Sequence, residues 1–203
     1  CQNIALGDTA MGGADTTGSN NIAVGTGSMD ALTTGINNVA IGNNTLSTSI
    51  TGCQNIAIGI STMASGNVTG INNLAMGTAA AAELTTGICN IAIGAGAFGA
   101  ATTGCNSIAI GEQALGVCAT AGNDNIMIGR ATGRRVSSGG QNVIIGGLAF
   151  CDANAGGENT AVGFRALEKS NAASNYNTAI GVDSLSNVTT GDQNAGLGRE
   201  SGA

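Results

Sequence analysis

A phrase that recurs every 17 or 18 residues is the feature that most constrains the fold of this chain of 203 residues. The phrase runs Asn, aliphatic, Ala, aliphatic, Gly, as in "NIAIG" at 55–59. We call its last residue the anchor glycine and number the other positions of each copy from it. The twelve anchor glycines are Gly7, Gly25, Gly42, Gly59, Gly77, Gly94, Gly111, Gly129, Gly146, Gly163, Gly181 and Gly198. A fixed period of this length is typical of solenoids, in which each repeat forms one rung stacked on the next.

Two other positions keep a constant distance from the anchor glycine. Position −7 is usually a second glycine, and position −4 is Ser107 in one copy and Asn in all the others. The asparagines are Asn3, Asn21, Asn38, Asn55, Asn73, Asn90, Asn125, Asn142, Asn159, Asn177 and Asn194. The extra residue of an 18-residue step therefore falls in the arm that follows the anchor glycine. It recurs in every third copy, which divides a single repeat domain, 1–203, into super-repeats 1–52, 53–104, 105–156 and 157–203.

Alternation within the phrase predicts a short β-strand in each copy. Position −1 is aliphatic or Met in all twelve copies, position −3 is aliphatic in the first nine, and position −2 is Ala in nine. A two-residue period indicates a strand with one buried face, so we expect positions −3 and −1 to face the core and Ala to line the opposite face. Position +4 is usually bulky, as at Phe98 and Leu115, and is expected to point inward from the arm. The whole pattern predicts an all-β fold, a parallel β-solenoid of about twelve rungs.

The remaining positions agree with this interpretation. The repeated Asn suits a turn stacked on its own copies through side-chain amides. A helix is the competing interpretation of "TAAAAEL" at 78–84, but the stretch fills the arm of one copy only, so we interpret it as a variant arm.

The composition indicates a thin rung that gains from association with other chains. There are 35 Gly, one Tyr, three Phe and no Trp, so little bulk is available for a core. Three buried aliphatic side chains per rung stabilise it by about 5–8 kcal/mol, whereas ordering its residues costs on the order of 20 kcal/mol. We therefore expect a tight oligomer, with the small Ala face packed against another chain.

The strings "NTAIGVDSLSNVTTGDQN" at 177–194 and "ENTAVGFRAL" at 158–167 resemble repeats of phage tail fibres and bacterial surface fibres, often found ahead of an endosialidase-type chaperone domain. The phrase "SIAIG" at 107–111 is also similar to the head repeats of trimeric autotransporter adhesins, although those repeats are shorter. The resemblance covers the whole chain. It implies a homotrimeric fibre segment that projects from a virion or a cell surface and supports attachment to a host or a surface.

Charge and residue types argue against other function classes. Histidine is absent, and the carboxylates show no recurrent paired spacing, so neither an enzyme nor a metal or cofactor site is expected. All six basic residues lie in the last third of the chain, while residues 1–129 carry six acids and no base, which argues against nucleic acid and anionic membranes as partners. No apolar run is long enough to insert into a membrane.

Two sets of side chains remain as candidates for chemistry or contact. The arm "RATGRRVSS" at 130–138 is variable, so Arg130, Arg134 and Arg135 are the expected surface contact for a host receptor or glycan. The six cysteines are expected to be free and largely buried, although Cys89 and Cys105 lie in adjacent rungs and could meet in an oxidising environment.

Two alternative functions stay open. One is a filament subunit that polymerises by stacking repeat ends, because solenoid ends normally need caps. The other is an ice-binding solenoid, suggested by threonine pairs at 16–17, 33–34, 85–86, 102–103 and 189–190. Against ice binding, adjacent residues point to opposite sides of an extended chain, and several copies have lost the pair.

Overall fold

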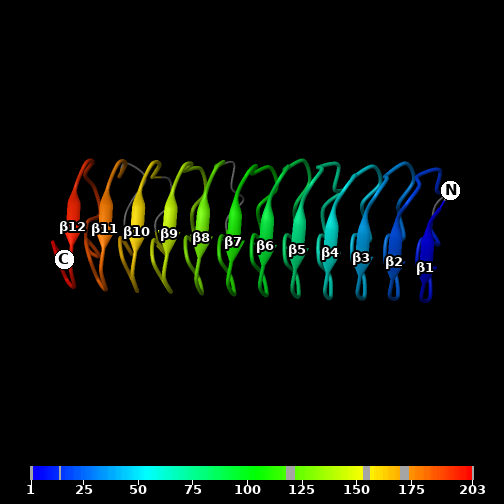
Figure 1. Cartoon of the computed structure of the whole chain (residues 1–203), viewed down its shortest axis with the longest axis horizontal. Helices are drawn as coiled ribbons and strands as arrows, with labels where there is room; N and C mark the ends of the chain where they lie inside the picture. The colour runs from blue at the N-terminus through cyan, green and yellow to red at the C-terminus, as the bar shows by residue number, and fades with distance from the viewer. Residues whose placement is uncertain (1, 14, 118–121, 153–155, 170–173, 203) are drawn as a thin grey trace.

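The computed structural model, which describes residues 2–13, 15–117, 122–152, 156–169 and 174–202, is a straight solenoid built from one strand per repeat (Figure 1). Each strand has three residues and coincides with positions −3 to −1. The strands are β1 (Ile4–Leu6), β2 (Ile22–Val24), β3 (Val39–Ile41), β4 (Ile56–Ile58), β5 (Leu74–Met76), β6 (Ile91–Ile93), β7 (Ile108–Ile110), β8 (Ile126–Ile128), β9 (Val143–Ile145), β10 (Thr160–Val162), β11 (Thr178–Ile180) and β12 (Ala195–Leu197).

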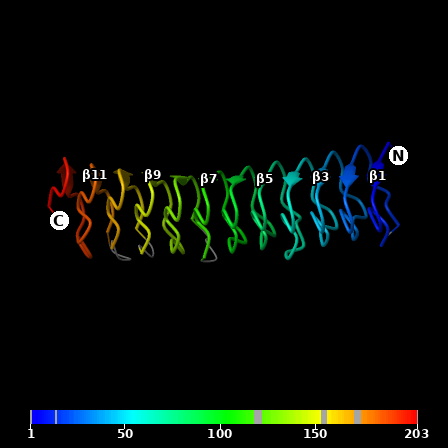
Figure 2. The same ribbon diagram turned by 90° about the horizontal axis from the view of Figure 1, so that it is seen from below.

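All twelve strands form one parallel sheet in sequence order, β1 to β12. The register places equivalent repeat positions side by side, with Ile91 opposite Ile108 and Ala92 opposite Ala109. Each repeat position therefore becomes a column that runs along the rod. Seen from below, the strands lie along one side of the rod and the arms loop away on the other (Figure 2). The predicted all-β parallel solenoid is confirmed, and residues 78–84 form turns after β5 rather than a helix.

The structure reverses the predicted orientation of the strands. From β2 onward the alanines at position −2 are buried, as Ala23, Ala57 and Ala109 illustrate with 0% exposure, while the flanking aliphatic side chains are partly open to solvent. Ile22 and Ile56, for example, are 36% and 40% exposed. The prediction that positions −3 and −1 face the core was therefore wrong, and so was the prediction of an outer Ala face.

The narrow space between strand and arm explains this reversal. Position +4 does point inward as predicted, and its side chains are among the largest fully buried ones: Met29, Leu46, Met63, Phe98, Leu115, Phe150 and Leu167. In most rungs one side chain of this size fills the space, and position −2 on the strand above it is Ala; in the rung of β9, Ile144 and Phe150 are both buried. A second buried set from the end of the arm, Leu32, Val68, Leu84 and Val136, completes the core.

The arm follows an unusual backbone path that selects its residues. Position +4 has a left-handed backbone conformation, with φ near +50° at Leu46, Met63 and Leu115. A β-branched side chain is strained in this conformation. Wherever position +4 is bulky, the residue is accordingly Met, Leu or Phe, and never Val or Ile.

The anchor glycines make the turn from strand to arm. Gly59 has φ of +135°, and a Cβ there would come within 2.7 Å of the carbonyl oxygen of Gly77 in the next rung. Only glycine allows rungs to stack this closely. The arms are also hydrogen bonded from rung to rung, as from Met29 N to Thr45 O at 2.9 Å.

Candidate functional site

The column of asparagines at position −4 is an internal hydrogen-bond ladder. Asn90 donates from Nδ2 to Asn73 Oδ1 at 3.1 Å and to Gly104 O at 2.6 Å, and its backbone N–H donates to the same Oδ1 at 3.0 Å. Most of these side chains are buried, with Asn21, Asn55, Asn125, Asn142 and Asn177 at 0% exposure. Each amide thus joins one rung to its neighbours within the buried interior, which is a structural role rather than a contact with a ligand.

Ser107 interrupts this ladder between β6 and β7. Its N–H still donates to Asn90 Oδ1 at 3.0 Å, and its Oγ accepts from Asn125 N at 3.3 Å. The shorter Ser107 side chain instead donates to Cys105 O at 3.2 Å. It therefore does not extend to Gly122 O, the position −7 carbonyl of the next rung.

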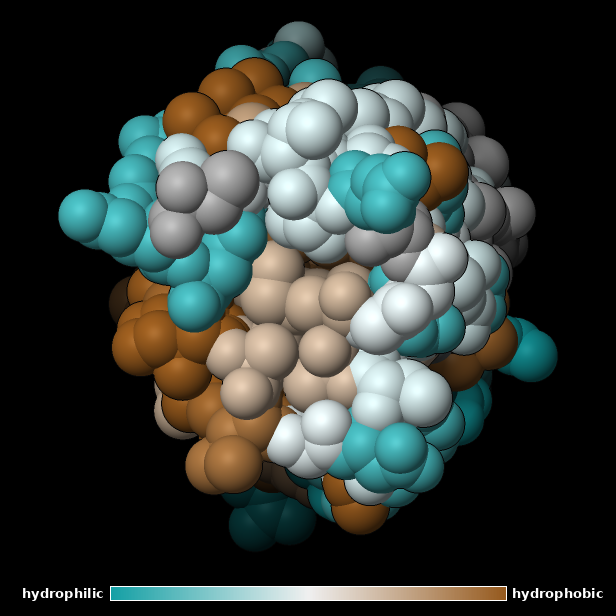
Figure 3. Space-filling view, turned by 90° about the vertical axis from the view of Figure 1, so that its right-hand side faces the viewer, coloured by the Kyte–Doolittle hydropathy of each residue, from teal (hydrophilic) through white to brown (hydrophobic). Residues whose placement is uncertain are grey.

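The outer face of the sheet is the most extensive feature that the structure leaves open. It consists of the side chains at positions −3 and −1, which form two parallel columns along β1 to β12. On the inner strands the exposed fraction of these side chains reaches 40%, with Ile41 at 40%, Met76 at 38% and Ile145 at 39%. In the end-on view, apolar atoms gather on the left, the side of the strands, while the right side is mainly neutral and polar (Figure 3). We call this surface the apolar face.

A signal for this orientation is present in the sequence. Position −3 changes to Thr160 and Thr178 in two later copies, whereas position −2 is never polar. A column that accepts hydroxyl groups faces solvent more often than one that excludes them.

The predicted arginine contact lies on the arm after β8. Arg130 and Arg135 are exposed and Arg134 is half-buried. Asp152 of the next rung pairs with both Arg135, at 3.4 Å, and Arg134, at 3.9 Å. Part of the positive charge of this arm is therefore neutralised within the molecule, and its role in ligand contact stays a prediction.

The cysteines that the structure describes, Cys53, Cys89, Cys105 and Cys151, are all free. Cys151 is buried, Cys53 and Cys105 are partly buried, and Cys89 is exposed, so the expectation of largely buried thiols was wrong for Cys89. Burial raises the pKa of the Cys151 thiol, against a smaller opposing effect of the nearby Arg134 guanidinium. Cys1 and Cys118 lie outside the described residues.

Neither a metal cluster nor a membrane-spanning helix occurs in the described part of the chain. No group of three or more His, Cys, Asp or Glu side chains is placed there to hold a metal ion. None of its segments forms a helix long and apolar enough to cross a membrane.

Comparison with known proteins gives no match: no family model, curated protein or solved structure is similar to this chain.

Proposed function

We propose that this chain is a structural segment of a fibre, in which rods associate side by side through the apolar face as a homotrimer. The fibre projects from a virion or a cell and supports attachment to a host or a surface. The apolar face is the observation that carries this proposal. The Ala column is buried within the rod, so the apolar face is the surface that can pack against another chain.

The size of the apolar face supports association. Twelve aliphatic or Met side chains at position −1 and nine aliphatic ones at position −3 line it. With about a third of each side chain exposed, the face presents on the order of 1,000 Å² of apolar surface, more than the few hundred Å² that soluble monomers usually leave open. An area of this order matches what each partner contributes to a stable protein interface.

The regular register favours a parallel arrangement of identical rods. When rods run side by side around an axis parallel to their length, each rung meets the same rung of its partners, so the whole face is buried at once. All chains then point the same way, as a fibre that projects from a surface requires. The choice of three chains follows the resemblance to trimeric fibre repeats.

Light scattering on the purified chain tests the proposal. We expect a mass of three times 19.5 kDa that does not change with concentration. The double variant Ile58→Lys with Ile110→Lys places charges on the apolar face and should abolish the trimer. The matched control, Thr51→Lys with Thr103→Lys, carries the same charges in the same rungs on exposed positions outside the face. A wild-type folded monomer, or a trimer unaffected by the first variant, would contradict the proposal.

One observation favours ice binding as a second candidate. Threonines at position −8 are exposed in six consecutive rungs, at Thr17, Thr34, Thr51, Thr69, Thr86 and Thr103. They form one regular column. Adjacent threonines of a pair point to opposite sides, but this column uses only one threonine of each pair, so the objection does not apply to it. A thermal-hysteresis assay tests this candidate, and unchanged freezing behaviour would exclude it.

A further inference from the structure

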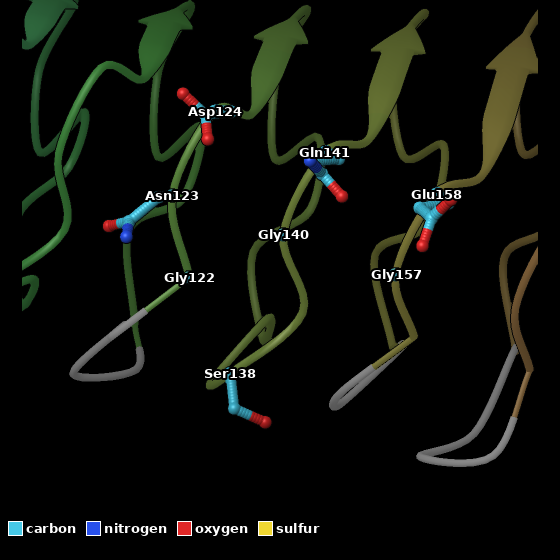
Figure 4. A pocket seen from close by; sticks show the side chains of 8 residues that line it. All are labelled: Gly122, Asn123, Asp124, Ser138, Gly140, Gln141, Gly157 and Glu158. Atoms are coloured by element: carbon cyan, nitrogen blue, oxygen red, sulfur yellow. The ribbon is translucent and has the colours of Figure 1, made fainter.

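A shallow groove interrupts the regular surface next to β8, β9 and β10. Its volume is about 360 Å³, and it is lined by Gly122, Asn123, Asp124, Ser138, Gly140, Gln141, Gly157 and Glu158 (Figure 4). Position −6 creates it. This position carries Ile or Cys in most earlier rungs, but Gly140 and Gly157 in two consecutive rungs here. The missing side chains leave an open floor of backbone.

Two backbone N–H groups of the floor lack the side-chain acceptor that is found elsewhere in this column. Where position −6 of the next rung is Asn or Asp, its side chain accepts from the backbone N–H, as Asn175 Oδ1 does from Gly157 at 2.9 Å. Asn123 Oδ1 accepts from Cys105 N in the same way at 2.9 Å. The residues that follow Asn123 and Gly140 in this column are glycines, so these two amides face no such acceptor.

The upper wall of the groove is a column of polar side chains at position −5: Asp124, Gln141 and Glu158. All three are exposed. Their backbone is fixed, since Gln141 N donates to Asn123 O and Glu158 N donates to Gly140 O, both at 2.9 Å. The wall thus offers two carboxylates that accept hydrogen bonds and one carboxamide that both donates and accepts.

The next residue in the same column is Tyr176, the one tyrosine of the chain. It is 53% exposed. The neighbouring Glu158 carboxylate raises the pKa of Tyr176, first as a hydrogen-bond acceptor and second through its charge. The ring therefore lies next to the groove, beside Glu158, with a large part of its apolar surface open to solvent.

We propose that this groove binds a neutral linear oligosaccharide lying along the rod axis. Sugar hydroxyls donate to Asp124 and Glu158 and accept from the floor amides, and the ring of Tyr176 packs against the C–H groups of a pyranose. Rungs are spaced at about 4.8 Å, close to the length that one pyranose adds to an extended chain, so successive sugars meet equivalent positions. This proposal rests on the attachment role of the fibre and gives it a ligand class.

Charge and spacing select this ligand over two others. The lining contains two carboxylates and no basic residue, so sialylated, sulfated or phosphorylated glycans are repelled. Asp124 and Glu158 stand two rungs apart, about 10 Å, which is too far for both to bind one divalent cation directly.

Binding to an array of immobilised oligosaccharides tests the proposal. The array should hold oligomers of glucose, mannose and N-acetylglucosamine beside sialylated ones, and we expect binding to neutral oligomers only. Gly157→Asn restores the residue type found at positions 123 and 175, fills the groove and should weaken binding at least tenfold. Ile71→Asn makes a similar change in the same column, five rungs away from Gly157, and should leave binding unchanged.

Two further variants examine the wall. Glu158→Gln and Tyr176→Ala should each weaken binding about tenfold. The absence of binding to neutral oligomers, binding to sialylated oligomers alone, or binding that Gly157→Asn leaves intact would overturn the proposal. Light scattering on the same samples separates the two proposals, because a trimer that binds no glycan contradicts only the groove, and a monomer that binds contradicts only the trimer.

Discussion

Met127 occupies the space that Gly133 leaves empty in the core of one rung. A Cβ on Gly133 would come within 2.7 Å of Met127 Sδ. In the preceding rung the same two positions are Ala109 and Leu115, so the large and the small residue have exchanged places. These two rungs therefore keep a similar core volume although both residues differ between them.

This exchange predicts a strong coupling between the two positions. Met127→Ala leaves a cavity opposite a glycine and should lower the free energy of unfolding by about 2–5 kcal/mol. Gly133→Leu alone overfills the rung and should cost at least about 1–3 kcal/mol. The double variant restores the Ala–Leu pair and should recover most of the loss, because φ is +57° at Gly133 and +49° at Leu115. Urea unfolding at one fixed protein concentration measures all three, and additive losses would contradict the coupling.

The backbone at position +4 predicts that shape matters there more than volume. Leu115 is fully buried and has a left-handed backbone conformation, so Leu115→Ile introduces a β-branched side chain where it is strained. We expect a loss of about 1–3 kcal/mol in the free energy of unfolding. Leu115→Met is the control, since Met is found at this position in other rungs, and should cost less than about 1.5 kcal/mol. Equal losses in the two variants would show that the backbone conformation does not select the residue.

The architecture follows from the sequence because a solenoid repeats every choice twelve times. The same glycine or asparagine at the same position of nearly every copy indicates that each copy has the same conformation. The period alone therefore predicts stacked rungs and their boundaries. The strands coincide with positions −3 to −1 because the alternation is confined to these residues between Asn and the anchor glycine.

The sequence pattern does not predict correctly which side of the strand faces the core. A two-residue period defines two faces but does not say which is buried, and hydrophobicity favours the Ile face over the Ala face. Two structural facts decide which face is buried. The left-handed backbone conformation at position +4 points Phe98 or Leu115 into the core of its rung, and little space remains between that side chain and the strand. The groove at Gly140 and Gly157 is also visible only in the structure, because it depends on two glycines that are 17 residues apart in the sequence and adjacent in space.

Completing the asparagine ladder should stabilise the protein. Ser107→Asn supplies an Nδ2 that can donate to Gly122 O and an Oδ1 that can accept from Asn125 Nδ2, the contacts that Asn142 makes with Gly156, at 3.0 Å, and Asn159, at 3.1 Å. We expect a gain of about 1 kcal/mol in the free energy of unfolding. Asn142→Ala makes the opposite change and should cost about 3 kcal/mol or more, since it leaves several buried polar groups unpaired. Exposed Asn43→Ala is the control and should change little. A loss of stability in Ser107→Asn would show that the ladder has no room for the larger side chain.

The contact between Tyr176 and Glu158 predicts a titration that is simple to observe. The chain has one tyrosine and no tryptophan, so the rise in ultraviolet absorbance of the phenolate reports Tyr176 alone. The pKa of Tyr176 lies above its ordinary value because the Glu158 carboxylate accepts its hydrogen bond and repels the phenolate. Glu158→Gln removes the charge and should lower this pKa toward the ordinary value. Asp192→Asn removes a weaker electrostatic effect and should lower it less. Identical titrations of the wild type and Glu158→Gln would mean that Tyr176 does not lie against Glu158 in solution. Tyr176 would then not be expected to contact a sugar bound in the groove.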